Sequence, residues 1–250
     1  MDQKQMRYRR HWDSYWRQIV ANNLQGRVLW ESAPERSAWE DMERFRPYIN
    51  EALPLLDLGC GSGKQTRFLA RHFGRVIGVD VSPAVVEHAQ QTSDDSSSVE
   101  WRVFNALNTK EAEALHAELG DMNIYVRGVF HVIDEKDRDI FVSTLETLLG
   151  AQGTLYQIEL TVEALAYVRA INHDGSLRFP KVVQPTGFNI SRDKEKYFPG
   201  NRWMLLDEGE NVTLHTVALK NGEEGAVPAN YLVLRRRVSN QAYTEENTLE

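Results

Sequence analysis

Residues 53–64 read Leu53-Pro-Leu-Leu-Asp-Leu-Gly-Cys-Gly-Ser-Gly-Lys64, an apolar run with one acid followed by three alternating glycines. The apolar run predicts a buried strand. The glycines predict a tight turn where the backbone lets a ligand approach closely. The next residues, 65–73, carry apolar side chains at helical spacing. Strand, glycine turn and helix in this order are typical of the place where open α/β sheets bind nucleotides.

Three glycine motifs compete for this turn. A Walker loop needs Gly-x-x-x-x-Gly-Lys-Ser/Thr, but the chain has Leu58 in place of the first glycine and Gln65 in place of Ser or Thr. A dinucleotide fingerprint, Gly-x-Gly-x-x-Gly, needs a third glycine where the chain has Lys64 or Thr66. The pattern that remains is Asp-x-Gly-x-Gly-x-Gly.

A second acidic residue follows roughly 20 residues after the glycine turn. Residues 75–82 form another apolar stretch, which contains Asp80 near its end. In nucleotide-binding α/β folds an acid that ends the second strand, roughly 20 residues past the glycines, binds the ribose hydroxyls. Val81 is placed to pack on an adenine face. Ser82 and Pro83 then predict the start of a helix, as N-cap and first helical residue.

Residues 57–63 resemble motif I of the class I S-adenosylmethionine (SAM)-dependent methyltransferases. The resemblance covers roughly residues 53–160 by motif and the remainder only by the expected number of strands. It implies a Rossmann-like α/β fold, with five parallel strands and a C-terminal β-hairpin in one seven-stranded sheet and helices on both faces. It also implies SAM as cofactor and S-adenosylhomocysteine (SAH) as product. The cofactor-binding positions that it implies are Asp57, Gly59, Cys60, Gly61, Gly63, Asp80 and Val81.

The third predicted strand, residues 99–104, ends at Asn105 and Ala106. In the family that this chain resembles, an Asp commonly occupies this strand end and binds the adenine amino group. The amide oxygen of Asn105 can accept the same hydrogen bond. We therefore expect Asn105 and Ala106 to contact the adenine.

Residues 121–133 predict the fourth strand and its exit at the carboxyl edge of the sheet, where the acceptor should bind. Arg127 can hold a carboxylate of SAM or of the acceptor in a fork. His131 is a candidate general base for a hydroxyl. Its alternative interpretation is a structural residue at a helix start. Methyl transfer to an amine or thiolate needs no base beyond proximity and alignment.

Residues 1–50 are rich in aromatic and charged side chains and predict a helical lid. Tyr15, Trp16 and Trp30 are candidates for the wall of the acceptor site, where aromatic rings exclude water and attract the sulfonium. The alternative is that this apolar stripe packs on the helices of the sheet. A second predicted helix runs from about residue 36 to residue 50.

Residues 51–250 are predicted to form the methyltransferase domain. An irregular insertion at about 172–203 would lie on the substrate side, since long segments of this kind are usually functional. Its Tyr197 and Phe198 either line the acceptor pocket or anchor the loop to the core. Residues 211–219 and 228–237 predict the closing hairpin.

Composition limits the function classes. The chain has 250 residues, 42% of them apolar, and a formal net charge of −7, which argues against a nucleic-acid backbone as main partner. A single cysteine, Cys60, excludes an intrachain disulfide and a multi-cysteine zinc site, and no clustered acids indicate a metal. No apolar run reaches the length of a membrane span and no secretory signal is present, so we expect a cytoplasmic protein without membrane association.

The function that these observations favour is in-line transfer of the SAM methyl group to an oxygen, nitrogen or sulfur atom of a small-molecule acceptor. Two other classes stay open. The chain can methylate a protein or a tRNA, which a basic surface stripe would favour. It can also be a SAM-binding module without catalysis. The sequence leaves the acceptor and the oligomeric state open.

Overall fold

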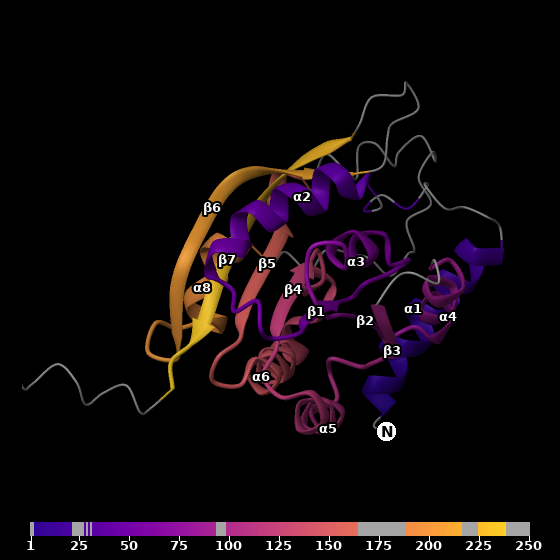
Figure 1. Ribbon diagram of the computed structural model, residues 1–250, viewed down its shortest axis with the longest axis horizontal. Helices are drawn as coiled ribbons and strands as arrows, with labels where there is room; N and C mark the ends of the chain where they lie inside the picture. Colours follow the sequence, from indigo (N-terminus) through magenta and orange to yellow (C-terminus); the bar gives the residue numbers. More distant parts are fainter. Residues whose placement is uncertain are drawn as a thin grey trace, which may run out of the picture.

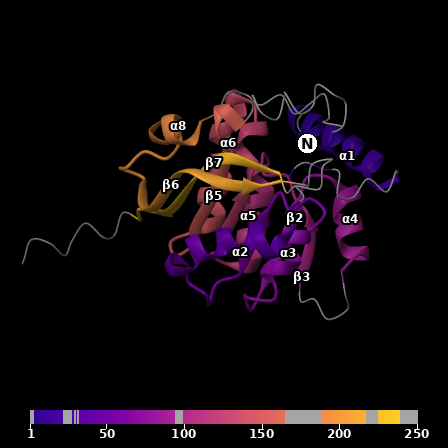
Figure 2. The same cartoon turned by 90° about the horizontal axis from the view of Figure 1, so that it is seen from above.

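The computed structural model describes residues 3–21, 28, 30, 32–93, 99–164, 189–216 and 225–238, without the side chains of residues 3–5. Its centre is a seven-stranded sheet of order β3-β2-β1-β4-β5-β7-β6 (Figures 1 and 2). Neighbouring strands from β3 to β5 are parallel, while β7 is antiparallel to both β5 and β6. The predicted fold is confirmed. The strands are β1 (Leu55–Leu58), β2 (Val76–Asp80), β3 (Val99–Val103), β4 (Asn123–Arg127), β5 (Thr154–Leu160), β6 (Trp203–His215) and β7 (Ala226–Arg236).

Helices cover both faces of the sheet (Figure 1). On one face lie α5 and α6, and on the other α2 and α3. Helix α1 lies beside α4 near the β3 end of the sheet in both views. The helices are α1 (Gln3–Ala21), α2 (Pro34–Phe45), α3 (Lys64–Leu69), α4 (Pro83–Gln91), α5 (Thr109–Leu119), α6 (Arg138–Leu149) and α8 (Ile190–Tyr197), with 3-10 turns η1 (Arg46–Tyr48), η2 (Phe130–Val132) and η3 (Glu135–Asp137).

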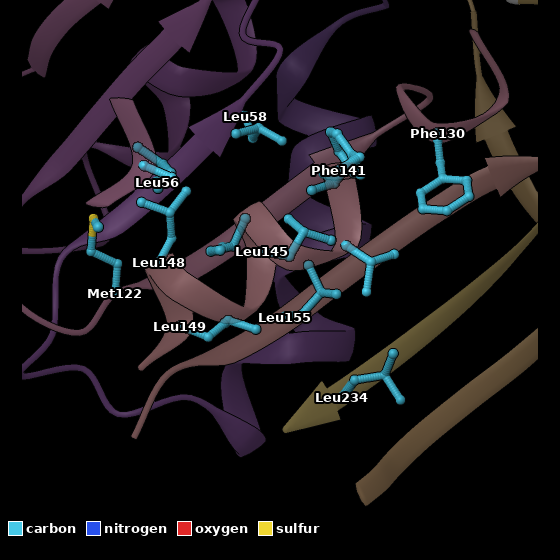
Figure 3. Packing of buried hydrophobic residues seen from close by; sticks show 14 of the residues in the cluster. Leu56, Leu58, Met122, Phe130, Phe141, Leu145, Leu148, Leu149, Leu155 and Leu234 are labelled. Carbon is cyan, nitrogen blue, oxygen red and sulfur yellow. The ribbon is translucent and has the colours of Figure 1, made fainter. Parts of the chain in front are cut away.

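The main core lies between the sheet and α5 and α6. Leu56 and Leu58 of β1 point into it, and they meet Phe141, Leu145 and Leu148 of α6 (Figure 3). The second core, on the other face, takes Leu55 and the aromatic side chains of β4 and β5. Because both faces are covered, the parallel strands are buried throughout, which explains their continuous apolar sequence.

Parallel register places the functional strand ends at one edge. Leu58 of β1 pairs with Val79 of β2 and with Val126 of β4, so the residues that follow these strands emerge side by side. The turn into α4 is as predicted. Ser82 caps the helix by accepting from the Val85 N–H, and a proline stands in the first turn.

Two predicted boundaries are wrong. Strand β6 starts at Trp203 and not at residue 211, and the segment before it contains α8. Register shifts between Leu205 and Asp207 and between Gly209 and Val212 interrupt β6, so its side chains do not alternate regularly along the sequence. Helix α2 ends at Phe45, ahead of residue 50, and a 3-10 turn containing a proline follows. Residues 172–188 of the predicted insertion lie outside the described residues.

Residues 1–50 divide between two places. Helix α1 packs on α4 through Tyr15, Trp16 and Ile19. Helix α2 packs through Met42 and Phe45 on the face of the sheet opposite α5 and α6. The lid prediction therefore concerns α1 and its connection to α2, and the division of the chain into lid and domain stays a prediction. Within the described part of the chain, no helix has the length and apolar character needed to cross a membrane.

Candidate active site

A cavity lies at the carboxyl edge of the sheet, beneath α1. It holds about 1130 Å³ of empty space, part of which is open to solvent. The ends of β1, β2 and β3 form one half of its wall, and residues 127–129 and 131–133, the end of β5 and the end of β6 form the other half. Aromatic side chains of α1 and Trp30 close it from above.

The glycine turn places backbone directly against the cavity. Gly59 and Gly61 line it, whereas Cys60 and Gly63 do not. Gly59 has φ +85°, and a Cβ there would lie 2.6 Å from Val129 Cγ2. Gly63 has φ +78°, and a Cβ there would lie 2.2 Å from the Trp101 ring. These positions thus need glycine for conformation and for close packing. Cys60 is buried, and burial raises the pKa of its thiol, which fits an inert small residue.

Asp80, at the end of β2, presents its carboxylate to the cavity. Its Oδ2 accepts from the Gly61 N–H at 3.2 Å and its Oδ1 from the Ser82 N–H at 2.9 Å. Burial raises the pKa of Asp80 to about 6, against hydrogen bonds from backbone N–H groups that lower it. Val81 lines the cavity beside it.

Asp57 is not among the cavity-lining residues. Its carboxylate is buried behind the glycine turn, where Oδ2 accepts from Thr66 Oγ1 of α3 at 2.6 Å. Burial raises the pKa of Asp57 to about 7; the Thr66 hydrogen bond lowers it and the charge of Asp80 raises it further. Asp57 thus joins β1 to α3 beneath the turn.

Asn105 and Ala106 line the cavity after β3. Asn105 Oδ1 accepts from the Leu107 N–H at 3.0 Å. Asn105 Nδ2 is buried without a hydrogen-bond partner among the described residues. The predicted acceptor atom therefore already accepts one hydrogen bond, and the side-chain group to which the described residues offer no partner is a donor.

His131 lines the opposite half of the cavity and forms a buried pair with Glu159 of β5. His131 Nδ1 lies 2.7 Å from Glu159 Oε2. The Glu159 side chain is 0% exposed and also accepts hydrogen bonds from the N–H groups of Val129, Phe130 and His131. One carboxylate therefore fixes both the imidazole and the η2 turn that carries it.

Arg127 lines the cavity, but its guanidinium is largely engaged by protein. It donates to the carbonyls of Trp30 at 3.3 Å and His215 at 2.8 Å, and Nε lies 3.4 Å from Asp41 Oδ2. Asp41 is a buried acid of α2 that also accepts from the hydroxyls of Tyr125 and Tyr156, both at 2.7 Å. Arg127 therefore ties α2, β6 and the connection after α1 to the sheet, and it does not present an open fork.

Aromatic side chains close the cavity on the side of α1 and form the aromatic wall. Tyr8, Trp12 and Trp16 of α1, four residues apart, all line the cavity, as does Trp30. Tyr15 does not line it but packs edge-on against Trp16, with ring centroids 5.4 Å apart. Trp16 and Trp30 thus line the cavity, and their contact with an acceptor stays a prediction, while Tyr15 packs behind them.

Side-chain bonds fasten α1 at both ends of the cavity. Asp13 Oδ1 accepts from Ser82 Oγ at 3.1 Å and from the Ala84 N–H at 3.0 Å, at the start of α4. The Tyr8 hydroxyl accepts from the Asp134 N–H at 2.8 Å, just beyond η2. Helix α1 thereby contacts both the half with Asp80 and the half with His131.

The predicted pocket role of Tyr197 and Phe198 is wrong for the described structure. Both are buried in the main core, with their rings 5.2 and 5.9 Å from that of Phe130. The alternative interpretation, that they anchor their segment to the core, agrees with this placement. They support the η2 turn from below.

Comparison with known proteins identifies the family. Residues 55–153 match the family model described as a methyltransferase domain. A SAM-dependent methyltransferase from Anabaena variabilis has a similar structure, with a TM-score of 0.82 and 33% identity over 92% of this chain and 95% of that chain. This chain belongs to the class I SAM-dependent methyltransferases. It is an enzyme whose cofactor is SAM.

Other relatives of this methyltransferase carry a more specific name. A ubiquinone biosynthesis O-methyltransferase from Mesorhizobium japonicum is 27% identical over 80% of this chain and 78% of its own length. One from Brucella ovis is 28% identical over 75% of this chain and 74% of its own length. At this identity the likeness names the reaction class of those proteins and leaves the acceptor of this methyltransferase to be proposed.

Sequence reasoning missed three residues of the methyltransferase cavity and its frame: Tyr8, Asp13 and Glu159. Glu159 is the next-to-last residue of the fifth strand, much as Asp80 ends the second, and an acid near the end of a mostly apolar strand was an available signal. Asp13 lies among aromatic residues in a helix and gives no local signal, because its partners are about 70 residues away.

Proposed function

We propose that this methyltransferase transfers the SAM methyl group to a hydroxyl oxygen of a small, largely apolar molecule, with His131 as general base. The observation that carries the proposal is the buried His131–Glu159 pair in the cavity wall. The relatives named ubiquinone biosynthesis O-methyltransferase support an oxygen acceptor. Apolar side chains of the same cavity, among them Leu160, Leu214 and Trp30, favour an apolar acceptor.

The cofactor fits the half of the cavity that holds Asp80. There Asp80 would accept hydrogen bonds from the ribose hydroxyls, and the backbone of Gly59 and Gly61 would admit the aminoacyl end. Val81 and Ala106 would pack on the adenine. The buried amide nitrogen of Asn105 supports this placement, because a buried donor requires a partner and the described residues offer it none.

Two predicted ligand contacts take indirect roles in this proposal. Asp57 would position the glycine turn through Thr66, since its carboxylate does not reach the cavity lining. Arg127 would hold the wall around Trp30 in place, since its guanidinium binds protein carbonyls and lies against Asp41.

The chemistry of His131 follows from its pairing. A carboxylate beside Nδ1 favours the tautomer with the proton on Nδ1, so Nε2 is the nitrogen that takes a proton from the acceptor hydroxyl. The negative charge of Glu159 then stabilises the imidazolium. SAM supplies an electrophilic methyl group on its sulfonium, open to in-line attack by an oxygen nucleophile. The aromatic wall would exclude water and favour the cation by cation–π attraction.

The test measures turnover with radiolabelled SAM on ring-matched phenol, thiol and aniline acceptors. We expect the phenols to be methylated. His131→Ala should lower kcat by about 10²- to 10³-fold, the size of general base catalysis, with SAH affinity within about twofold of wild type by isothermal titration.

The matched control is His116→Ala, because His116 also pairs with a carboxylate, Asp121 at 2.8 Å, but lies on α5 outside the cavity lining. It should leave kcat unchanged. A kcat for His131→Ala within about threefold of wild type from pH 6 to 9 would refute the base role. Preference for the thiol or the aniline would refute the hydroxyl acceptor.

A further inference from the structure

The side chain of Asn105 is held in one orientation by its own loop. Oδ1 accepts from the Leu107 N–H at 3.0 Å, the Asn105 N–H donates to Glu111 Oε2 at 2.8 Å, and the Asn105 carbonyl accepts from the Asn108 N–H at 2.8 Å. Only the carbonyl end of an amide can accept from an N–H group. Turning the amide over would place two donors face to face at Leu107, so the oxygen faces Leu107 and the NH₂ group points elsewhere.

The side-chain NH₂ group of Asn105 is a buried hydrogen-bond donor to which the described residues offer no acceptor. Asn105 is 7% exposed, and Nδ2 has no hydrogen-bond partner in the described part of the chain. The nearby carboxylate of Glu111 is already engaged by the Asn105 N–H at one oxygen and by Asn108 Nδ2 at the other, at 2.7 Å. A buried N–H without a partner is unfavourable, so a ligand atom that accepts is the expected partner.

The surroundings of Asn105 in the cavity are apolar and suit a flat ring. Val81, Phe104, Ala106 and Leu107 line the cavity around it. A purine held between such side chains presents ring nitrogens with lone pairs, which accept, and an exocyclic amino group, which donates. The Nδ2 group of Asn105 is complementary to the ring nitrogens and not to the amino group.

We propose that Asn105 donates a hydrogen bond from Nδ2 to a ring nitrogen of the SAM adenine, the reverse of the acceptor role expected for this strand end. The proposal rests on the proposed placement of the cofactor beside Asp80. Asn105 then specifies the base by its ring acceptor and leaves the exocyclic amino group to other contacts.

The decisive variant is Asn105→Asp, studied by isothermal titration with SAH. One carboxylate oxygen keeps the Leu107 N–H, while the other places a lone pair against the lone pair of the ring nitrogen. We expect SAH affinity to fall about tenfold or more, and Asn105→Ala to weaken it less, since alanine removes the bond without adding repulsion. Asn189→Asp is the matched control, because Asn189 Oδ1 also accepts a backbone N–H, that of Arg192, outside the cavity lining. It should bind SAH as wild type does.

A second arm uses the unmodified enzyme, so that it does not depend on the folding of a variant. Among 1-deaza-, 3-deaza- and 7-deaza-SAH, we expect one analogue to lose about tenfold in affinity and Asn105→Ala to bind that analogue and SAH equally. SAH binding by Asn105→Asp as tight as or tighter than wild type would overturn the proposal, as would equal affinities for all three analogues and SAH.

The placement of the cofactor has its own control in Asp80→Ala. If Asp80→Ala weakens SAH binding while Asn105→Asp does not, the direction of the Asn105 hydrogen bond is wrong and the placement stands. If Asp80→Ala binds SAH as wild type does, the placement itself is wrong, and the Asn105 proposal falls with it.

Discussion

The two halves of the cavity are built in different ways. The half with Asp80 consists of strand ends and turns between residues 59 and 107, each of which follows its strand directly. The half with His131 depends on partners far along the chain, such as Glu159 for His131 and His215 for Arg127. The first half is a property of the fold, since parallel strands must end at one edge. The second is a property of this particular chain, and it is where enzymes of one fold come to differ.

The largest expected effect that distinguishes the two halves is that of a substitution at Glu159, which should lower turnover without weakening cofactor binding. In Glu159→Gln the amide oxygen can still accept from the N–H groups of Val129 and Phe130, but the amide NH₂ faces His131 Nδ1. The imidazole proton then moves to Nε2, which can no longer take a proton from the acceptor. We expect kcat to fall about 100-fold or more, in the range lost with a general base, while SAH affinity changes less than about twofold.

The readouts for Glu159→Gln are methyl transfer and SAH titration on the same preparation. Asp121→Asn is the matched control, because Asp121 also accepts backbone N–H groups and pairs with a histidine, just after the C-terminal end of α5 and outside the cavity lining. A drop in SAH affinity as large as the drop in kcat would show that the two halves are not separable. A normal kcat would show that Glu159 does not orient a base.

The contrast also explains what the sequence could predict. The order of the strands, the glycine turn and Asp80 follow from apolar runs, glycine spacing and one acid per strand end, all local signals. A local sequence pattern cannot reveal that the side-chain oxygen of Asn105 accepts a hydrogen bond from the Leu107 N–H. Nor can it reveal that Arg127 lies against Asp41 of α2. Tyr197 and Phe198 show the same limit, since an aromatic pair in a loop has the same sequence whether it lines a pocket or fills a core.

Helix α1 contacts both halves through side-chain hydrogen bonds, so it can break the comparison. Asp13→Ala removes the acceptor for Ser82 Oγ and the Ala84 N–H and loosens the attachment of α1, which carries Trp12 and Trp16. We expect SAH to dissociate about 5- to 10-fold faster, the size of two lost hydrogen bonds of modest net strength, and the KM for the acceptor to rise as well. Stopped-flow tryptophan fluorescence measures the dissociation.

The control for this prediction is Asp13→Asn, whose amide oxygen can still accept from Ser82 and Ala84. It loses the ion pair with Arg17, which is exposed and contributes little. We expect it to release SAH within about twofold of the wild-type rate. If Asp13→Ala releases SAH at the wild-type rate, α1 does not hold the cofactor. Cofactor binding in the half with Asp80 would then not depend on how α1 is attached.

The smallest effect on function is expected at Asp57, which lies beneath the glycine turn and not in the cavity lining. Asp57→Asn keeps an oxygen for Thr66, so SAH affinity should change less than about threefold.

The pH dependence of the stability should change instead. Burial raises the pKa of Asp57 to about 7 and that of Asp80 to about 6, above the ordinary value near 4. Between these values the folded state binds more protons than the unfolded state, so the unliganded enzyme loses stability as the pH rises from about 4 to 7.

Asp57→Asn removes one of these two protonation sites. Each pH unit between the folded and unfolded pKa values is worth about 1.4 kcal/mol of the free energy of unfolding. The variant should therefore melt at a higher temperature than wild type at pH 8 and lose less stability between pH 5 and 8. Thermal melts of the unliganded enzymes across this range are the measurement. An equal pH dependence in both would mean that Asp57 ionises freely within the fold. That result would place Asp57 in contact with water or a cation, and hence on the cavity side of the glycine turn.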